Sequence, residues 1–159
     1  MLKYLLEITN NTRKVGEYKM SLNNDCFYCV KDSRLTDIML KVCNLEVSTL
    51  YLFKEQTYSG RCLVAYNGHV DEICDLSDEE RDAFMKDVAV AAKAMHKAFK
   101  PVKVNYGAYG DTMHHLHYHL VPKYEGGPDF GGVFRMNPQA VYLTDEEYNA
   151  LIAQVKENL

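Results

Sequence analysis

The sequence His-Leu-His-Tyr-His-Leu-Val occupies residues 115–121, and its alternation of histidine with larger side chains predicts a β-strand. Successive side chains of a strand point to opposite faces, so His115, His117 and His119 share one face, while the side chains between them anchor the strand in the core. At a rise of about 3.3 Å per residue, these imidazoles stand about 7 Å apart. Burying three imidazoles for stability alone is costly, because their nitrogens need hydrogen-bonding partners. The stretch therefore indicates a functional site.

Two chemistries use such a row of imidazoles differently. In the first, the histidines are ligands of a catalytic Zn²⁺ ion that keeps an open position for water. In the second, the middle residue, His117, attacks phosphorus, and its neighbours position it and stabilise the developing charge. The second is favoured, because Asn105 and the turn Gly110-Asp111-Thr112 supply amides and a hydroxyl suited to phosphate oxygens. No further carboxylate is spaced to act as the base of a metal-dependent hydrolase.

Capping signals predict two helices. The first follows Ser77, which forms a capping box with Glu80, and its apolar side chains recur every three or four residues, so we expect it at residues 78–100, before Pro101. The second begins with a capping box at residues 144–147 and continues nearly to the C-terminus. Each helix presents an apolar stripe that can pack against a sheet.

Four segments with strand-like composition surround the first helix, at residues 48–53, 62–66, 102–106 and 115–121. Pro122 is expected to end the last of them. The order strand, strand, long helix, strand, strand favours an α+β domain, with an antiparallel meander and helices on one side. Since no repeat or linker divides the chain, we expect a single domain over residues 1–159.

Composition limits the function classes. With 47% hydrophobic and 25% charged residues, the chain is typical of soluble globular proteins. No apolar run approaches the ~20 residues of a membrane span, and no signal-peptide core is present, so we expect a cytoplasmic protein without a membrane partner. The net charge of -4 and the pI near 5.8 argue against binding of long nucleic acids. A small nucleotide remains compatible, because backbone amides and a few side chains suffice to hold its phosphates.

Cys26 and Cys29 are separated by two residues, a spacing that lets both thiolates reach one tetrahedral zinc ion. A pair of reduced thiols is the alternative interpretation. A redox-active pair is less favoured, because no thioredoxin-like βαβ pattern surrounds the two residues. The pair therefore marks a candidate metal site near the N-terminus.

Residues 115–121 match the His-φ-His-φ-His-φ-φ signature of the histidine triad (HIT) nucleotide hydrolases and transferases, where φ is an apolar residue. The sequence resembles this family over most of residues 45–135, and its branch of bacterial diadenosine polyphosphate hydrolases in particular. Other matching segments are residues 60–65, residues 67–70, the capped long helix, Asn105-Tyr106, residues 122–124 and residues 131–134. The resemblance divides the domain into an N-terminal extension (1–44), a HIT core (45–135) and a C-terminal helix region (136–159).

The resemblance implies a five-stranded antiparallel sheet with a long central helix and a C-terminal helix, in a homodimer that binds a nucleotide. It also implies hydrolysis without a catalytic metal: His117 attacks the α-phosphorus and water then hydrolyses the nucleotidyl-histidine intermediate. His119 contacts the phosphates or the leaving group, and His115 completes the triad. The implied substrates are dinucleoside polyphosphates or related nucleotide conjugates. Phosphoramidate hydrolysis, nucleotidyl transfer and a nucleotide sensor with incidental turnover remain open.

Some branches of the family hold a structural zinc ion, and the resemblance places its ligands at Cys26, Cys29, His69 and His115. Such a Cys₂His₂ set has no open position, so the metal would hold the N-terminal segment against the sheet and take no part in the chemistry.

The sequence departs from the family pattern at two candidate binding residues. Arg61 replaces a histidine found in many relatives, so it either contacts phosphate through its guanidinium or has a structural or solvent-facing role. Asp111 replaces an amide residue near the α-phosphate, and its carboxylate would repel an anionic substrate unless it turns away. Residues 54–56 lie about where relatives bind ribose, but we expect them to form a solvated loop.

Overall fold

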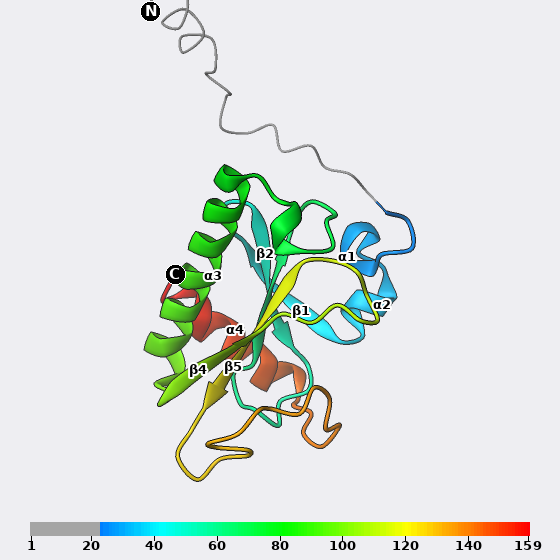
Figure 1. Cartoon of the computed structure of the whole chain (residues 1–159). Helices are drawn as coiled ribbons and strands as arrows, with labels where there is room; N and C mark the ends of the chain where they lie inside the picture. Colours follow the sequence, from blue (N-terminus) through cyan, green and yellow to red (C-terminus); the bar gives the residue numbers. More distant parts are fainter. Residues whose placement is uncertain (1–22) are drawn as a thin grey trace, which may run out of the picture.

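The computed structural model describes residues 23–159, so the first half of the expected N-terminal extension lies outside the described residues. Within them, helices pack on a five-stranded antiparallel sheet (Figure 1). The α+β class and the five-stranded HIT-like sheet with a long helix and a C-terminal helix are thereby confirmed. No helix in this part of the chain is long and apolar enough to cross a membrane.

The strands lie in the order β1-β2-β3-β5-β4, and every neighbouring pair is antiparallel. Their bounds are β1 (Met39–Asn44), β2 (Ser48–Phe53), β3 (Cys62–Tyr66), β4 (Lys103–Gly107) and β5 (His117–Lys123). The histidine-bearing β5 therefore lies inside the sheet, between β3 and the edge strand β4. The sequence pattern does not predict β1, because its buried side chains recur every third residue around a register shift between Lys41 and Cys43.

One face of the sheet is covered by α3 (Asp78–Phe99) and α4 (Asp145–Lys156), which begin at the two predicted capping boxes. Lys100 adopts a left-handed φ of 50° and ends α3 one residue before the expected position. Apolar side chains from both helices meet the sheet in the main core, among them Leu50, Leu52, Val64, Phe84, Val88, Met95, Leu120, Tyr148 and Val155. This layer packs the sheet against helices on one face.

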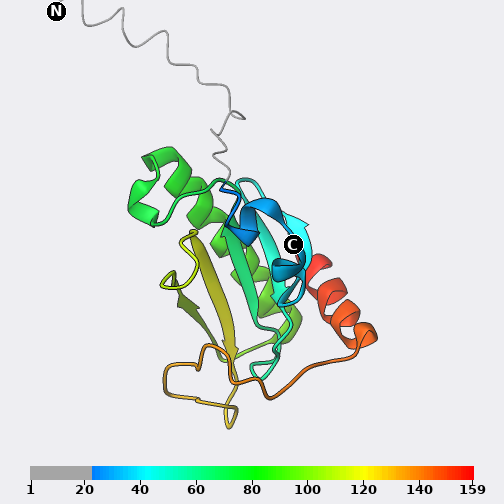
Figure 2. The ribbon, with the colours of Figure 1, turned by 90° about the vertical axis from the view of Figure 1, so that its right-hand side faces the viewer.

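The short helices α1 (Phe27–Val30) and α2 (Ser33–Thr36) lie across the opposite face, in front of the strands in Figure 2, with α3 behind them. A 3₁₀ turn, η1 (Ile73–Asp75), precedes α3. Side chains from α1, α2 and the sheet form a second core, which comprises Cys26, Tyr28, Leu35, Met39, Tyr51, Phe53, Leu63 and Ala65. The N-terminal segment from Cys26 onward is thus a packed part of the domain.

The histidine strand lies two residues further along the chain than the pattern suggests, so the expected strand at 115–121 is wrong at both ends. Pro122 lies inside β5, opposite Val104 of β4. It is tolerated there because the pairing of β5 with β3 ends at Leu120, so no β3 residue faces the missing N–H. His115 lies just before the strand.

A buried carboxylate joins α3 to the turn between β1 and β2. Asp87 is 3% exposed. It accepts hydrogen bonds from the backbone N–H groups of Glu46 at 3.2 Å and Val47 at 2.9 Å. The hydroxyl of Ser48 donates a third, at 2.7 Å. One side chain thereby satisfies three donors at the start of β2 and fixes the helix against the hairpin.

Replacing Asp87 by Ala should lower the free energy of unfolding by about 2–5 kcal/mol, because it leaves buried donors without an acceptor. Urea denaturation measures this difference. The matched control is Asp82→Ala on the same helix, where the side chain is 79% exposed and forms an ion pair with Arg81 at 3.5 Å. A loss no larger for Asp87→Ala than for Asp82→Ala would contradict the role assigned to the buried carboxylate.

Candidate active site and metal site

The three histidines lie on the face of the sheet opposite α3. In the antiparallel pairing of β3 with β5, His117 lies opposite Ala65 and His119 lies opposite Leu63, and both of these β3 side chains belong to the second core. The side chains of His115, His117 and His119 are all buried. The strand alternation that predicted a shared face thus places them on the side of the second core, where Tyr28 of α1 contacts the rings of His115 and His117.

His117 has its Nδ1 atom 2.7 Å from the backbone oxygen of His115. A carbonyl oxygen can only accept, so Nδ1 carries the proton and donates it, and Nε2 of the neutral ring keeps its lone pair. Burial lowers the pKa of His117, against the opposing effect of this hydrogen bond. The ring is therefore neutral near pH 7, with a nitrogen suited to nucleophilic attack.

His115 is hydrogen-bonded to a different carbonyl and is the opposite tautomer. Its Nε2 donates to the backbone oxygen of Tyr66 at 2.9 Å, so the lone pair lies on Nδ1. The aromatic ring of Tyr28 stacks on the imidazole, with ring centroids 4.7 Å apart. Nδ1 lies 3.4 Å from both the Cys26 sulfur and Nδ1 of His69. This nitrogen is thus directed toward the predicted metal ligands.

The structure brings together all four predicted metal ligands, Cys26, Cys29, His69 and His115, with their ligand atoms within 4.8 Å of one another. Cys26 caps α1 and Cys29 lies within it, which places both sulfurs on one side of a single turn. The Cys29 sulfur lies 3.5 Å from Nδ1 of His69 and 3.9 Å from Nδ1 of His115. A tetrahedral ion with bonds of about 2.0–2.3 Å needs ligand atoms about 3.3–3.8 Å apart. The residues therefore fit a metal ion.

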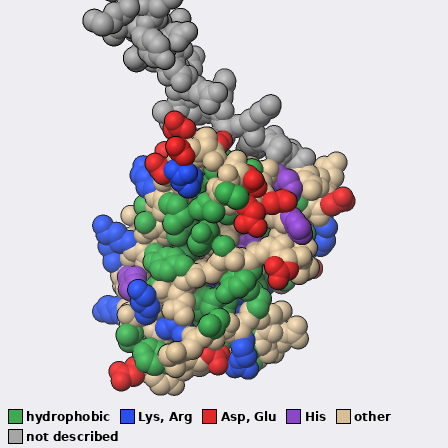
Figure 3. All heavy atoms as spheres, viewed as in Figure 1, with side chains coloured by type: hydrophobic (Ala, Val, Ile, Leu, Met, Phe, Trp, Pro, Cys, Tyr) green, Lys and Arg blue, Asp and Glu red, His purple; other side chains and the backbone are tan. Residues whose placement is uncertain are grey.

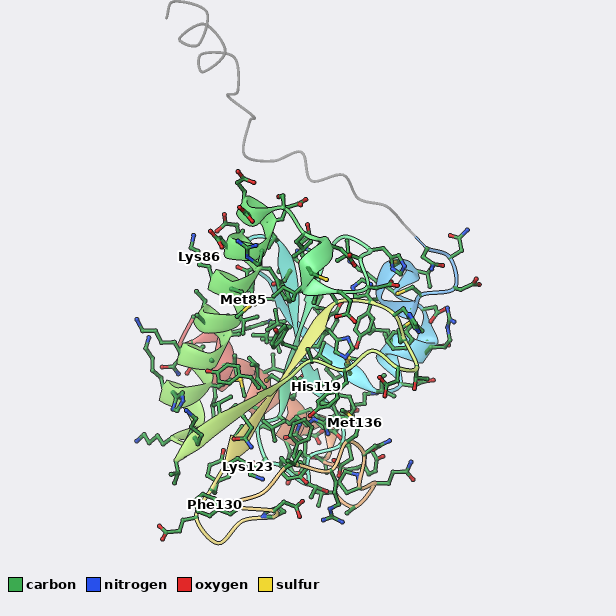
Figure 4. The ribbon with its side chains drawn as sticks, viewed as in Figure 1. Met85, Lys86, His119, Lys123, Phe130 and Met136 are labelled. Carbon is green, nitrogen blue, oxygen red and sulfur yellow. The ribbon has the colours of Figure 1, made fainter. Side chains whose placement is uncertain are left out.

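Arg61 lies in contact with the third histidine and is fully buried. Its Nη2 group donates to Nδ1 of His119 at 3.1 Å, and its Nη1 group donates to the backbone oxygen of Met136 at 2.6 Å. The guanidinium also lies over the ring of Phe53, 4.2 Å from its centroid. Figure 4 shows His119 and Met136 close together near the middle of the molecule. The solvent-facing alternative for Arg61 is excluded.

Gly60 sets the direction in which Arg61 enters the site. Its φ of +82° is left-handed, and a Cβ atom there would lie 2.5 Å from the Phe99 ring. Its N–H donates to the side chain of Gln56 at 2.7 Å. This turn lets the chain enter β3 with Arg61 directed inward.

Two residues expected in a solvated loop are buried instead. Glu55 is 2% exposed, and its Oε1 accepts from the backbone N–H groups of Ala140 and Val141, each at 3.3 Å. The N–H of Gln56 donates to the backbone oxygen of Val141 at 2.8 Å. The expectation is wrong for both because residues 134–142, here called the C-terminal strap, return across this end of the sheet. No local sequence pattern predicts such a long-range contact.

The predicted phosphate contact Asn105 lies on β4, in an open hollow of about 380 Å³ that is lined by Lys103, Val104, Asn105, Tyr106, Tyr109, Gly132, Val133 and Phe134. The rings of Tyr109 and Phe134 each lie 6.2 Å from the ring of His119, measured between centroids. The hollow thus borders the third histidine.

The turn Gly110-Asp111-Thr112 follows β4, with its Asp and Thr side chains exposed. Among the described residues, no hydrogen bond or ion pair joins this turn to the three histidines. The carboxylate of Asp111 is thus turned to solvent, away from the buried rings.

Charged side chains of both signs are interspersed on the face shown in Figure 3, with apolar side chains between them. This distribution agrees with the net charge of -4 and contrasts with the continuous basic surface of proteins that bind long nucleic acids.

The family model of the HIT domain matches residues 40–126, more than half of the 159 residues. The chain belongs to the HIT family. A curated relative, "Protein hit" of Bacillus subtilis, is 27% identical over 90 residues, which cover 54% of this chain and 62% of the relative. This HIT chain thus spans less than two thirds of that relative's length.

Solved structures of HIT proteins share the fold. A histidine triad protein from Sinorhizobium meliloti has a TM-score of 0.74 at 22% identity, covering 80% of this chain and 95% of its own. A hypothetical histidine triad nucleotide-binding protein from Sulfolobus tokodaii has a TM-score of 0.64 at 22% identity, with 83% and 89% covered. A HIT family protein from Bacillus anthracis has a TM-score of 0.57 at 25% identity, with 87% and 99% covered.

His119 should make the stability of this HIT domain depend on pH. Burial, Arg61 and His117 lower its pKa to about 2, whereas the unfolded ring has a pKa of about 6.5. The unfolded state therefore binds more protons below pH 6.5, and stability falls as the pH is lowered through that range. For this one proton, the free energy of unfolding falls by up to ~1.4 kcal/mol per pH unit. Urea denaturation at pH 7.5 and 5.5 measures it.

The variant His119→Asn, which keeps an acceptor for Arg61 but does not titrate, should show a smaller loss of stability between the two pH values. His96→Asn serves as the control, because His96 is exposed on α3. Equal losses for the His119 variant and the unsubstituted protein would rule out this explanation.

Proposed function

We propose that this HIT protein is a nucleotide hydrolase that cleaves at the α-phosphate of dinucleoside polyphosphates or related nucleotide conjugates, through a nucleotidyl-His117 intermediate. The observation that carries the proposal is the hydrogen bond from Nδ1 of His117 to the His115 carbonyl, which leaves Nε2 as a neutral nucleophile. Family membership supports nucleotide chemistry in general, and the Sulfolobus relative is described as nucleotide-binding.

In the first step, the Nε2 lone pair of His117 forms a bond to the α-phosphorus while the bond to the leaving group breaks, and the electron pair stays on the leaving group. In the second step, water attacks the same phosphorus, the P–N bond breaks, and its electron pair returns to Nε2. The nucleoside monophosphate is released, and the protons of the water pass to solvent.

His119 contributes a hydrogen bond to the transition state. Because Arg61 donates to its Nδ1, the proton of the neutral His119 ring lies on Nε2. That N–H is free to donate to an oxygen on which negative charge develops, and such preorganised donors stabilise phosphoryl transfer. The centroids of the His117 and His119 rings are 5.1 Å apart, close enough for both rings to contact one phosphate group.

We further propose that Cys26, Cys29, His69 and His115 hold a structural zinc ion. When bound, zinc would supply a closed tetrahedral link between α1 and the sheet, with no open position for catalysis. His115 then contributes its ring to the metal site and its backbone oxygen to His117.

The variant His117→Ala should lose turnover of diadenosine tetraphosphate by at least about 10³-fold, because it lacks the nucleophile, and nucleotide binding should persist. Release of monophosphate and mass spectrometry of a trapped adenylyl adduct provide the measurement. His96→Ala, on the exposed side of α3, is the matched control and should keep full activity. Undiminished hydrolysis by His117→Ala would overturn the proposed mechanism.

The double variant Cys26→Ser, Cys29→Ser should lose zinc, from about one equivalent per chain to none, and should unfold at a lower temperature. Metal analysis of the purified protein and a thermal melt measure both effects. The control is Cys74→Ser, because Cys74 is exposed and outside the cluster. Absence of zinc from the unsubstituted protein, or zinc retained by the double variant, would refute the site.

A further inference from the structure

The hydrogen bond from Arg61 restricts the His119 ring to one tautomer and to the neutral state. A guanidinium has donors and no acceptor, so the nitrogen that receives its hydrogen bond must lack a proton. This nitrogen is Nδ1 of His119, 3.1 Å from Nη2. The single proton of the ring then lies on Nε2. A second proton at Nδ1 would break the hydrogen bond and place two buried cations side by side.

The surroundings of His119 oppose a positive charge on its ring. The rings of Phe53, Tyr109 and Phe134 lie around it at centroid distances of 6.0, 6.2 and 6.2 Å. Apart from Tyr109, the titratable groups that face it are Arg61 and His117, and no carboxylate contacts the ring among the described residues. Burial lowers the pKa of Arg61 only to about 10, so the guanidinium remains charged near pH 7.

Arg61 itself is fixed in place by the C-terminal strap. Its Nη1 donates to the Met136 oxygen at 2.6 Å, and its Nη2 lies 3.2 Å from the Met136 sulfur. The guanidinium also stacks between Phe53 and Phe134, at 4.2 and 5.3 Å from the ring centroids. These contacts hold the buried guanidinium beside His119.

The charge state of His119 bears on which leaving groups the site can expel. A phosphate or polyphosphate departs with the electron pair of the broken P–O bond as a stable anion, and a hydrogen bond from a neutral N–H stabilises it. An amine departs from a P–N bond only if its nitrogen receives a proton. A His119 imidazolium could supply that proton as a general acid, and this is the charge state that Arg61 disfavours.

We propose that Arg61 is a specificity-determining positioning residue, which holds His119 as a neutral Nε2–H donor and so favours substrates that release a phosphate anion over those that release an amine. This inference rests on the proposed function and narrows it from nucleotide conjugates in general to nucleoside polyphosphates. It assigns to Arg61 a role exerted through His119, without direct contact to the substrate.

The first test is independent of turnover and uses a variant only to assign signals. Two-bond ¹⁵N–¹H correlation spectra of the unsubstituted protein at pH 7 report the tautomer of each histidine, and the His119 signals are assigned by their loss in His119→Asn. We expect a neutral His119 ring protonated at Nε2. A ring protonated at Nδ1, or an imidazolium, would overturn the proposal.

The second test compares kcat/KM for diadenosine tetraphosphate and adenosine 5′-phosphoramidate. We expect the unsubstituted protein to prefer the tetraphosphate by about 10²-fold or more, the range attributed to a missing general acid. Arg61→Met, which keeps length and apolar contacts, should reduce this preference about tenfold or more. Arg81→Met on the exposed surface of α3 is the control and should leave the preference unchanged.

The outcomes separate the two claims. A preference for the phosphoramidate, or an unchanged preference in a folded Arg61→Met protein, would overturn the role of Arg61 while hydrolysis through His117 stands. If neither substrate is turned over and no adduct forms, the proposed function fails, and the substrate preference fails with it. If Arg61→Met does not fold, the spectra and the preference of the unsubstituted protein still decide.

Discussion

The hydrogen bond from Nδ1 of His117 to the backbone oxygen of His115 is the interaction on which the site depends. An imidazole alone exchanges its proton between two nitrogens, and only one tautomer leaves the attacking lone pair in place. In this protein the backbone oxygen of His115 selects the tautomer of His117, independently of substrate and solvent. The other two rings follow the same rule, since the Tyr66 oxygen fixes His115 and the Arg61 guanidinium fixes His119. His117 therefore keeps its lone pair on Nε2, whereas His115 and His119 carry their proton there.

The features that the sequence predicts are those encoded over a few residues. Strand alternation places the histidines on one face, capping boxes locate α3 and α4, and the two-residue spacing of Cys26 and Cys29 places both thiols on one turn. The limits of β5 are less predictable, because Pro122 favours a strand end in the sequence, and its place inside β5 depends on where the pairing with β3 stops. Residue patterns carry no information about where a neighbouring strand stops.

Burial by the C-terminal strap is the feature that local patterns miss entirely. Glu55 and Gln56 are polar residues beside Gly60, and every local signal favours a solvated turn. Their burial results from hydrogen bonds to Ala140 and Val141, more than eighty positions away. The same return of the chain converts Arg61 from a possible surface cation into a partner of His119. The sequence shows that arginine replaces histidine at position 61, but the role of Arg61 follows only from its long-range contact with Met136.

The position of β5 inside the sheet has a consequence for evolution. The strand pairs with β3 from His117 to Leu120 and with β4 from His119 to Lys123, so His119 and Leu120 have strand partners on both sides. An internal strand opens only when the whole sheet does, so its backbone belongs to the most stable cooperative unit of the domain. Substitutions that weaken the fold therefore lower the amount of active protein before they alter the arrangement of the rings. Selection on chemistry and selection on stability act here on the same residues.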